Sequence, residues 1–440
     1  MFTEDPMNNE TLYWVWLAQR LGAGSKYLTE VLSRFGSPFE VYRADEDSIV
    51  GENRDMRSWQ KVLCDKNLEE AMSICRSCER LGVEIVPYDD ARYPTRLRAI
   101  SNPPTVLYCR GKLPVFDKLL CIGVVGTRKM SEYGCRSAYK ISYELAASGI
   151  ITVSGMALGI DSVVACATFA AKGHTVAVLG CGIDVVYPAA HRKVYNELLR
   201  NGSIISEYPP GMRPTRYSFP LRNRIISGLS QGVFVVEGDM NSGAMITAKD
   251  ALVQGRELFA LPGNVGESNA NGTNSMIRDG AHPVISSLDI IEEYLPLYAK
   301  VVKADVAKNM GSASDYNPSV MAHYCVLPEF DSESKKENAK AERKVTGSKV
   351  AVTAPSVSAE KAEKTEKVKE KKDDGSREAY ASLSPDLLAV YEKLPSDNSA
   401  ISIDRIARDG LSVGDVMSSL TLLELQGLVV SLPGGMYART

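Results

Sequence analysis

The amino-acid sequence predicts an α/β protein: a Rossmann-like, doubly wound, mostly parallel sheet, with an N-terminal helical domain and a C-terminal winged-helix domain. Three observations support this. The chain has 440 residues, too many for one ordinary domain. Short apolar strands alternate with helices from about residue 119. A charged stretch without aromatic residues, 331–379, precedes a second ordered pattern. The expected domains are 1–85, helical; 86–296, Rossmann-like; 297–379, flexible charged linker; and 380–440, winged helix.

The N-terminal domain is expected to be a set of short helices. Residues 10–80 have apolar residues at helical spacing, interrupted at Gly22-Ala23-Gly24 and again at Gly36-Ser37-Pro38. A Gly-x-Gly turn between two short helices is typical of a helix-hairpin-helix or SAM-like unit, whose backbone amides can hold a phosphate. Residues 1–85 contain 10 basic and 15 acidic groups, so a plain helical packing domain is the favoured interpretation.

The central domain is predicted from its strand and helix alternation. The expected strands are 119–126, 150–155, 175–180, 203–207, 232–237 and 257–262, and the expected helices include 131–148, 159–171 and 188–200. Ligands of such sheets bind at the carboxyl ends of the strands, so the residues that follow each strand are the candidates for function.

The last domain shows three helical segments and a hairpin around Pro433-Gly434-Gly435, which is a winged-helix pattern. Its third helix, roughly 412–426, contains Asp415 and Glu424 and no Lys or Arg. A DNA-reading helix without cations would lack the phosphate attraction that dominates affinity, so a protein-interaction role is favoured here.

Composition excludes several classes of protein. No run of 18 apolar residues predicts a membrane span, and the acidic N-terminus is unlike a secretory signal. Nine scattered cysteines indicate reduced thiols in a cytoplasm. The single close pair, Cys75 and Cys78, lacks the second pair that a zinc site needs, and the histidines are not spaced as ligands. No dinucleotide fingerprint, phosphate-binding P-loop or Ser-His-Asp set occurs. We therefore expect a cytoplasmic protein without metal, cofactor or catalytic residues.

The candidate binding residues follow the first strand and lie in an acid-free window. In "GVVGTRKMSEYG" (123–134), Arg128 occupies a turn that leads into a helix, which suits a phosphate. Between Glu207 and Glu237 there is no acidic residue, and four arginines alternate with Tyr208, Tyr217 and Phe219. Cations and flat rings suit single-stranded nucleic acid. Alternatively, these arginines cap carbonyls or pair with distant acids.

Other residues at the same edge are given structural roles. Asp161 begins a helix after the second strand, where a carboxylate caps. Cys181 stands between two glycines and fills a tight turn. Two further segments face this edge: 241–255, which opens a helix with Asn, Ser and Gly, and the polar, glycine-rich loop 261–281. Both offer amides rather than acids or bases. A binding surface therefore fits better than an active site.

Six ordered motifs carry a resemblance to a known family: "VGTRKMSEYG", "SGMALGID", "SEYPPG", "FPLRNRIISGLS", "SGAMITA" and "GTNSMIRDGA". Over about 86–296 the chain strongly resembles the DNA-processing protein A (DprA/Smf) family. The resemblance implies a non-enzymatic protein that binds incoming single-stranded DNA during natural transformation, loads the RecA recombinase and forms a homodimer. The DNA pocket it implies contains Arg128, Arg222, Asn223 and Arg224, with Ser242 and Gly243 beside them. Thr127 and Phe219 complete the expected binding residues. We expect Ile225 and Ile226 to point inward, so that Arg222 and Arg224 face outward.

The sequence departs from the family pattern at three positions. The family usually has a basic residue at Leu158, a histidine at Ala165 and often a basic or polar residue at Leu221. Fewer cations imply DNA binding that depends more on stacking. The alternative function is a nucleotide phosphoribohydrolase on a similar fold. That class uses a "PGG-x-GT-x-x-E" segment, whereas this chain has "SGAMITAKDA" and "LPGN" without the glutamate.

Overall fold

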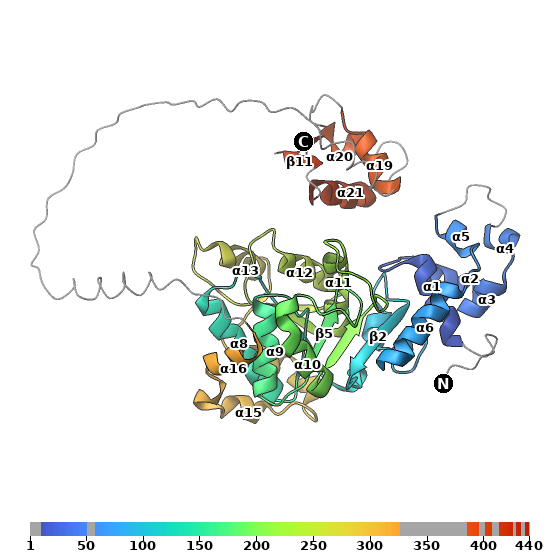
Figure 1. Ribbon diagram of the computed structural model, residues 1–440. Helices are drawn as coiled ribbons and strands as arrows, with labels where there is room; N and C mark the ends of the chain where they lie inside the picture. Colours follow the sequence, from blue (N-terminus) through green and yellow to red (C-terminus); the bar gives the residue numbers. More distant parts are fainter. Residues whose placement is uncertain are drawn as a thin grey trace, which may run out of the picture. The chain divides into compact units, whose positions relative to one another are not determined.

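The computed structural model describes residues 10–50, 58–325, 385–395, 401–406, 413–425, 428–432 and 436–439. The chain divides into two compact units, 1–346 and 347–440, and each is described by itself (Figure 1). The first contains the N-terminal helices and the large sheet. The second contains the C-terminal helices and a small sheet.

The large sheet has nine strands within the described residues, in the order β1-β2-β6-β5-β4-β3-β7-β8-β9. Neighbours from β6 to β9 are parallel, whereas β1 with β2 and β2 with β6 are antiparallel. The strands are β1 Glu84–Pro87, β2 Val106–Gly111, β3 Cys121–Val125, β4 Ile151–Ser154, β5 Thr175–Leu179, β6 Ser203–Ser206, β7 Gly232–Val235, β8 Glu257–Ala260 and β9 His282–Pro283. All six predicted strands are confirmed, and β1, β2 and β9 were not predicted.

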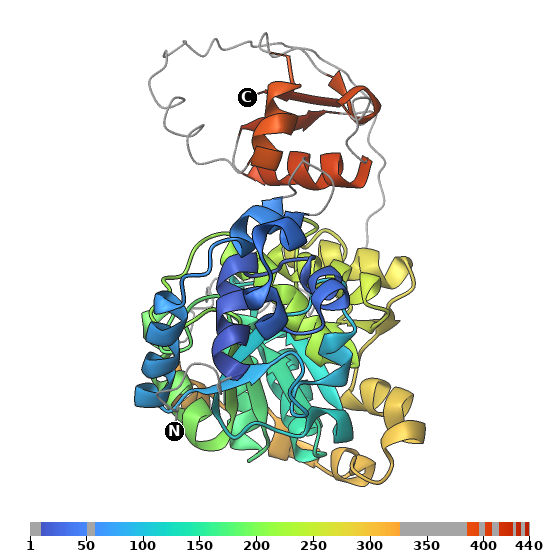
Figure 2. The ribbon, with the colours of Figure 1, turned by 90° about the vertical axis from the view of Figure 1, so that its right-hand side faces the viewer.

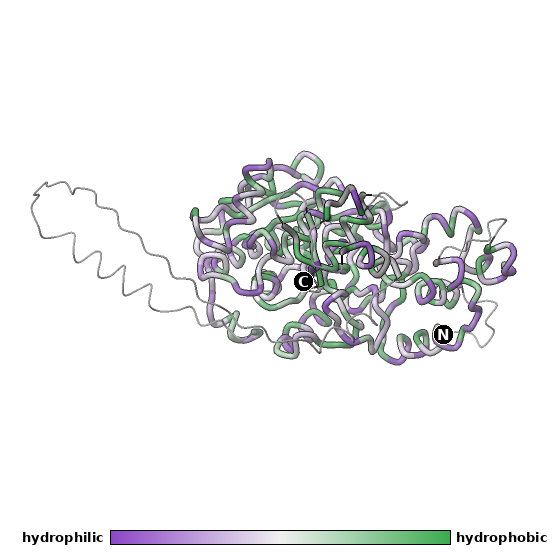
Figure 3. Tube along the Cα trace, turned by 90° about the horizontal axis from the view of Figure 1, so that it is seen from above, coloured by the Kyte–Doolittle hydropathy of each residue, from purple (hydrophilic) through white to green (hydrophobic). Residues whose placement is uncertain are grey.

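Both faces of this sheet are buried, which explains the continuous apolar runs of its strands. Along β3, Ile122 and Val124 join one core cluster, while Cys121 and Val125 join the other. The alternation follows from the two-residue period of a strand. In Figure 3, green hydrophobic segments alternate with purple hydrophilic ones along the trace.

Helices α8, α9 and α10 cover one face, and α11 and α12 cover the other. Their bounds are α8 Glu132–Ala147, α9 Ile160–Ala170, α10 Arg192–Asn201, α11 Ser218–Leu229 and α12 Gly243–Val253. The three helices predicted in this region are confirmed. The loop interpretation of 261–281 is wrong in part, because Ser268–Arg278 forms α13, where Ala270, Thr273 and Met276 are buried.

The N-terminal helices form a block beside β1 and β2, visible in blue in Figure 2. They are α1 Glu10–Leu21, α2 Leu28–Phe35, α3 Pro38–Arg43, α4 Glu46–Val50, α5 Ser58–Leu63 and α6 Glu69–Leu81. The predicted interruptions coincide with two turns: Gly22 and Gly24 have φ of 75° and 73°, and Gly36 has 83°. Such values favour glycine because other residues are strained there.

The predicted linker begins too early. After α14 (Ser287–Tyr298), residues 299–325 form α15 (Ala304–Lys308), a 3-10 turn (Gly311–Ser314) and α16 (Pro318–Tyr324). These elements pack on α8 and α9, where Ser314 Oγ donates to Glu144 Oε1 at 2.7 Å and Met321 is buried. Several apolar residues of this segment, among them Val302, Tyr316, Val320 and Tyr324, pack against the main core. The rest of the predicted linker, 326–379, lies outside the described residues.

The C-terminal unit has the predicted order of helices and hairpin. Helices α19 (Pro385–Glu392), α20 (Ile403–Ile406) and α21 (Val413–Leu425) accompany a sheet in the order β10-β12-β11. The strands are β10 Ile401–Ser402, β11 Val429–Leu432 and β12 Met436–Arg439. Val390, Leu394, Val416, Leu420 and Leu423 form its small core. This arrangement is a winged helix.

Candidate nucleic-acid interface

A cleft of about 620 Å³ opens at the carboxyl edge of the parallel strands. It lies where the strand order reverses: β3 is the first strand of the parallel series, and its neighbours are β4 on one side and β7 on the other. This switch point is where doubly wound sheets bind ligands. Seven of the eight predicted binding residues line it: Thr127, Arg128, Phe219, Arg222, Asn223, Ser242 and Gly243.

The turn after β3 is held rigidly from two sides. Thr127 N–H donates to the Glu237 carbonyl at 2.8 Å, and Ile160 N–H donates to the Thr127 carbonyl at 3.2 Å. Gly159 has a φ of 79°, and a Cβ added there would lie 2.3 Å from the Thr127 carbonyl oxygen. The close approach of α9 therefore requires glycine, and it fixes the base from which the exposed Arg128 projects.

An aromatic ledge lies beside Arg128. The Arg128 guanidinium carbon is 5.5 Å from the centroid of the Phe219 ring, a cation–π contact. The Phe219 ring is in turn 5.3 Å from the ring of Tyr187, with an angle of 32° between the planes. Tyr187 is 44% exposed, so a flat face is open to solvent. Sequence reasoning missed Tyr187, although its position after the third strand, in "GCGIDVVYP", was a usable signal.

The N-terminus of α12 faces the same cleft. The first N–H groups of a helix have no partner within it, which makes this end attractive to anions. Ser242 precedes the helix but its side chain makes no cap bond, and its Oγ is a buried atom without a partner among the described residues. Gly243 is exposed, and a Cβ added there would meet nothing within 4 Å. A phosphate can therefore approach this helix end closely.

Arg222 lines the cleft from below, and the prediction that it faces outward is wrong. Only 4% of the residue is exposed. Its Nη1 donates to the carbonyls of Gly155, at 2.8 Å, and Val178, and its Nε donates to Asn223 Oδ1 at 3.2 Å. Burial lowers the pKa of Arg222, an effect that nearby Asp161 opposes. The alternative interpretation of the sequence, an arginine that caps carbonyls, describes Arg222.

Arg224 is also buried, with 4% exposure, and it lies outside the cleft. Its Nη2 donates to both carboxylate oxygens of Glu207, at 2.7 and 2.6 Å. The Nε and Nη1 atoms of Arg224 are buried without a partner among the described residues. The outward orientation predicted for this side chain is wrong. Glu207, the residue that bounds the acid-free window, forms a buried ion pair with the Arg224 guanidinium.

Asp161 and Cys181 both have structural roles, but Asp161 does not cap α9 as predicted, because Gly159 is the N-cap and no side chain caps this helix. The buried Asp161 accepts hydrogen bonds from the backbone N–H of Gly155, at 3.1 Å, and of Ala157, at 3.2 Å, and so shapes the turn after β4. Burial raises the pKa of Asp161, and Arg222 opposes this. Cys181 is 1% exposed, and burial raises the pKa of its thiol to about 11, so it is a poor nucleophile at neutral pH.

The charge of the cleft is positive. Arg128 and Arg216 line it as exposed cations, and Arg222 lies beneath them. Among the described residues that line the cleft, Asp161 is the single carboxylate, and its side chain is held by backbone amides. Two exposed guanidiniums, an aromatic ledge and a free helix N-terminus match a phosphodiester chain with unstacked bases.

We predict that the free energy of unfolding depends on pH through Asp250, a residue of α12 that does not line the cleft. Burial raises its pKa from 3.8 to about 6, although Arg224 and Lys249 oppose this. Because the pKa is higher in the folded protein than in the unfolded chain, the protonated Asp250 contributes stability that is fully present below about pH 4. This contribution is lost as the pH rises through 6 and the carboxyl group ionises. We expect Asp250→Asn to raise the free energy of unfolding by about 1 kcal/mol at pH 8, after allowance for its partial exposure.

Thermal unfolding of the Asp250→Asn and wild-type proteins at pH 4 and pH 8 measures this difference. The matched control is Asp239→Asn, an exposed aspartate in the loop before the same helix, which should change little at either pH. An equal melting temperature of wild type and Asp250→Asn at pH 8 would contradict the burial of this carboxylate.

Comparison with known proteins agrees with the fold and the motifs. Residues 84–295 match the family model of DNA recombination-mediator protein A, and residues 375–435 match the DprA winged-helix domain. The DNA processing protein DprA of Bacillus subtilis is 40% identical over 48% of this chain and 71% of its own length. Protein Smf of Synechocystis is 34% identical over 64% of this chain and 72% of its own.

A solved structure extends the comparison to the fold. DNA processing protein A of Streptococcus pneumoniae superposes with a TM-score of 0.56 and 29% identity, covering 64% of this chain and 97% of its own. The Rossmann-like sheet and the winged helix, together with the two matching family models, place the chain among proteins of the recombination-mediator protein A type. Specifically, the chain belongs to the DprA/Smf family of DNA-processing proteins. No helix in the described part is long and apolar enough to cross a membrane.

Proposed function

We propose that this protein binds single-stranded DNA in the cleft at the carboxyl edge of the sheet, without catalysing a reaction on it. The observation that carries the proposal is the contiguous set of Arg128, Phe219 and Tyr187 beside the free N-terminus of α12. Phosphates interact with the guanidinium and the helix amides, and bases stack on the exposed ring of Tyr187. Arg222 and Asn223 support the floor of the cleft, and Arg224 stays outside it.

Family membership supports the remaining parts of the proposal. The relatives are DNA-processing proteins, and the matching family model is that of a recombination mediator. We therefore assign to this protein the delivery of the bound strand to the RecA recombinase during natural transformation, a homodimeric state and a cytoplasmic location. The absence of a free carboxylate from the described lining supports a binding role over a hydrolytic one.

Arg128→Ala tests the site. We expect affinity for oligo-dT to fall by roughly 1–3 kcal/mol, because the exposed cation and its stacking contact are both lost. The slope of log affinity against log salt should become shallower by about 1. Fluorescence anisotropy of labelled oligo-dT and of a duplex of equal length, titrated with full-length protein at several salt concentrations, measures both quantities.

The matched control is Arg200→Ala. Arg200 is exposed, and it stands at the end of α10, which leads into the start of β6 at the opposite edge of the sheet. Its loss changes the net charge equally, so its effect on affinity should be small. Equal affinities of the Arg128→Ala and Arg200→Ala proteins would refute the assignment of the cleft, and a preference of the wild type for duplex would refute the proposed ligand.

A further inference from the structure

We propose that the Gly22–Gly24 hairpin of the N-terminal helical block positions α11, and thereby sets the affinity of the cleft for single-stranded DNA. This inference rests on the proposed function. It makes Gly24 and Glu207 positioning residues, which act on the ligand through a helix that they hold.

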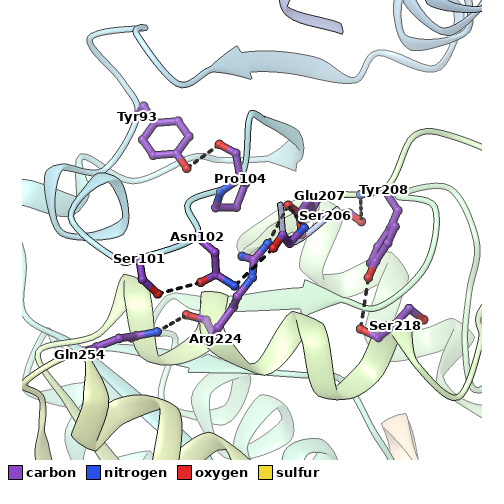
Figure 4. A network of polar contacts seen from close by, with 11 residues as sticks. Tyr93, Ser101, Asn102, Pro104, Ser206, Glu207, Tyr208, Ser218, Arg224 and Gln254 are labelled. Atoms are coloured by element: carbon purple, nitrogen blue, oxygen red, sulfur yellow. Dashed lines mark hydrogen bonds and ion pairs between the residues drawn. The ribbon is translucent and has the colours of Figure 1, made fainter. Parts of the chain in front are cut away.

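The first contact is polar. Gly24 N–H donates to Glu207 Oε1 at 2.9 Å, and Asn102 Nδ2 donates to the Gly24 carbonyl at 3.5 Å. The same Glu207 carboxylate receives Arg224 of α11 (Figure 4). A hairpin amide of the kind that can hold a phosphate thus holds a carboxylate of the protein itself, as the favoured interpretation of a packing domain implies. The amide, the carboxylate and the guanidinium form one continuous chain of hydrogen bonds from the hairpin to α11.

The second contact is steric. A Cβ added to Gly24 would lie 2.4 Å from Leu221 Cδ1, so the hairpin backbone presses directly on α11. The Leu221 side chain is partly buried in this contact. An apolar side chain here can pack against glycine backbone, whereas a charged one would be desolvated.

The two faces of α11 connect this joint to the cleft. Phe219, Arg222, Asn223 and Ile226 line the cleft, and their spacing places them on one side of the helix. Leu221 and Arg224, one turn apart, meet the hairpin and Glu207 on another side. Because packed helices move as units, a displacement at Leu221 moves Phe219 and Asn223 relative to Arg128 and the N-terminus of α12.

The chain provides a matched pair of glycines for the test. Gly22 and Gly24 have nearly equal φ, 75° and 73°, so alanine costs the backbone similar strain at either position. Only at Gly24 does the added Cβ meet another residue, because Gly22 has nothing within 4 Å. Gly22 instead borders a cavity of about 670 Å³ between the helical block and the sheet. A difference between the two variants therefore isolates the contact with Leu221.

We expect Gly24→Ala to weaken oligo-dT binding about tenfold relative to Gly22→Ala, within the range of couplings between contacting residues. Gly24→Ala combined with Leu221→Ala should restore affinity to that of Leu221→Ala alone, since the shorter side chain makes room. Full-length proteins are compared by anisotropy at 25 °C. Tryptophan fluorescence checks that each variant is folded, because Trp14, Trp16 and Trp59 all belong to the helical block.

A purely structural role would lower the melting temperature of Gly24→Ala and leave the affinity of the folded protein unchanged, which would overturn the inference. Wild-type protein that does not bind oligo-dT would overturn the proposed function and this inference with it.

Hydrogen exchange of the wild type keeps the test decisive if Gly24→Ala does not fold. By reciprocity, oligo-dT should slow exchange at Gly24 and leave α3 unaffected. Unchanged exchange at Gly24 in the presence of bound oligo-dT would also overturn the inference.

Discussion

Glu207→Gln is expected to lower the free energy of unfolding by about 3–5 kcal/mol, because it leaves the buried charge of Arg224 without its partner. The Glu207 and Arg224 side chains are 5% and 4% exposed, so solvent cannot replace the lost carboxylate. The Nε and Nη1 atoms of Arg224 already lack partners among the described residues, so Glu207 is the only acceptor that this guanidinium has there. Chemical denaturation of the full-length protein, followed by circular dichroism, measures the change.

The chain offers an exposed ion pair as a control for the same chemical change. Glu132 pairs with Arg136 at 2.8 Å one turn along α8, and the two side chains are 41% and 59% exposed. Glu132→Gln should cost no more than about 0.5 kcal/mol, since exposed pairs are screened by water. The double variant Glu207→Gln, Arg224→Met should recover most of the stability. Similar losses in Glu207→Gln and Glu132→Gln would contradict the buried pair.

The parallel core of the sheet was predictable because its strands are buried on both faces. Each is a continuous apolar run with a sharp end, such as "CIGVV" for β3. The two edges of the sheet were not. Edge strand β1 is the four-residue "EIVP" and edge strand β9 has two residues, so neither shows a period that separates it from a loop. Strand β2, inside the edge, begins with the buried apolar run "VLYC" and could have been predicted by the same rule as β3. Edge strands are defined by their neighbours, which a local pattern does not contain.

The cleft was largely predictable because its residues follow parallel strands, whose carboxyl ends must meet at one edge. The orientation of the arginines was not predictable in the same way. The acid-free window correctly indicated an excess of local charge, but the window is bounded by Glu207, and tertiary folding returns that carboxylate to Arg224. A carboxylate that bounds such a window can neutralise an arginine inside it, because folding brings Glu207 and Arg224, 17 residues apart, into contact.

The structure thus separates the arginines of the acid-free window by role. Arg216 is exposed and contacts the ring of Tyr217 at 5.0 Å, an arrangement suited to a ligand. Arg222 and Arg224 are buried, and each is engaged by protein oxygens. Loss of DNA binding in a variant is therefore ambiguous unless stability is measured beside it, and Arg222 is the residue at which the two effects are most easily confused.

Arg222→Ala should lower the free energy of unfolding by about 3–5 kcal/mol, since it leaves the carbonyls of Gly155 and Val178 without a donor and Asp161 without a nearby cation. Arg128→Ala, the exposed neighbour, should change stability by less than about 0.5 kcal/mol while weakening DNA binding. Arg222→Lys should recover only part of the loss, because an ammonium does not reproduce the planar guanidinium that reaches two carbonyls and Asn223 together.

Calorimetric melting of the three full-length variants, with oligo-dT binding measured on each at 20 °C, distinguishes the roles. Wild-type stability of Arg222→Ala would show that this arginine is not part of the structural core and would return it to the set of residues free to bind a phosphate.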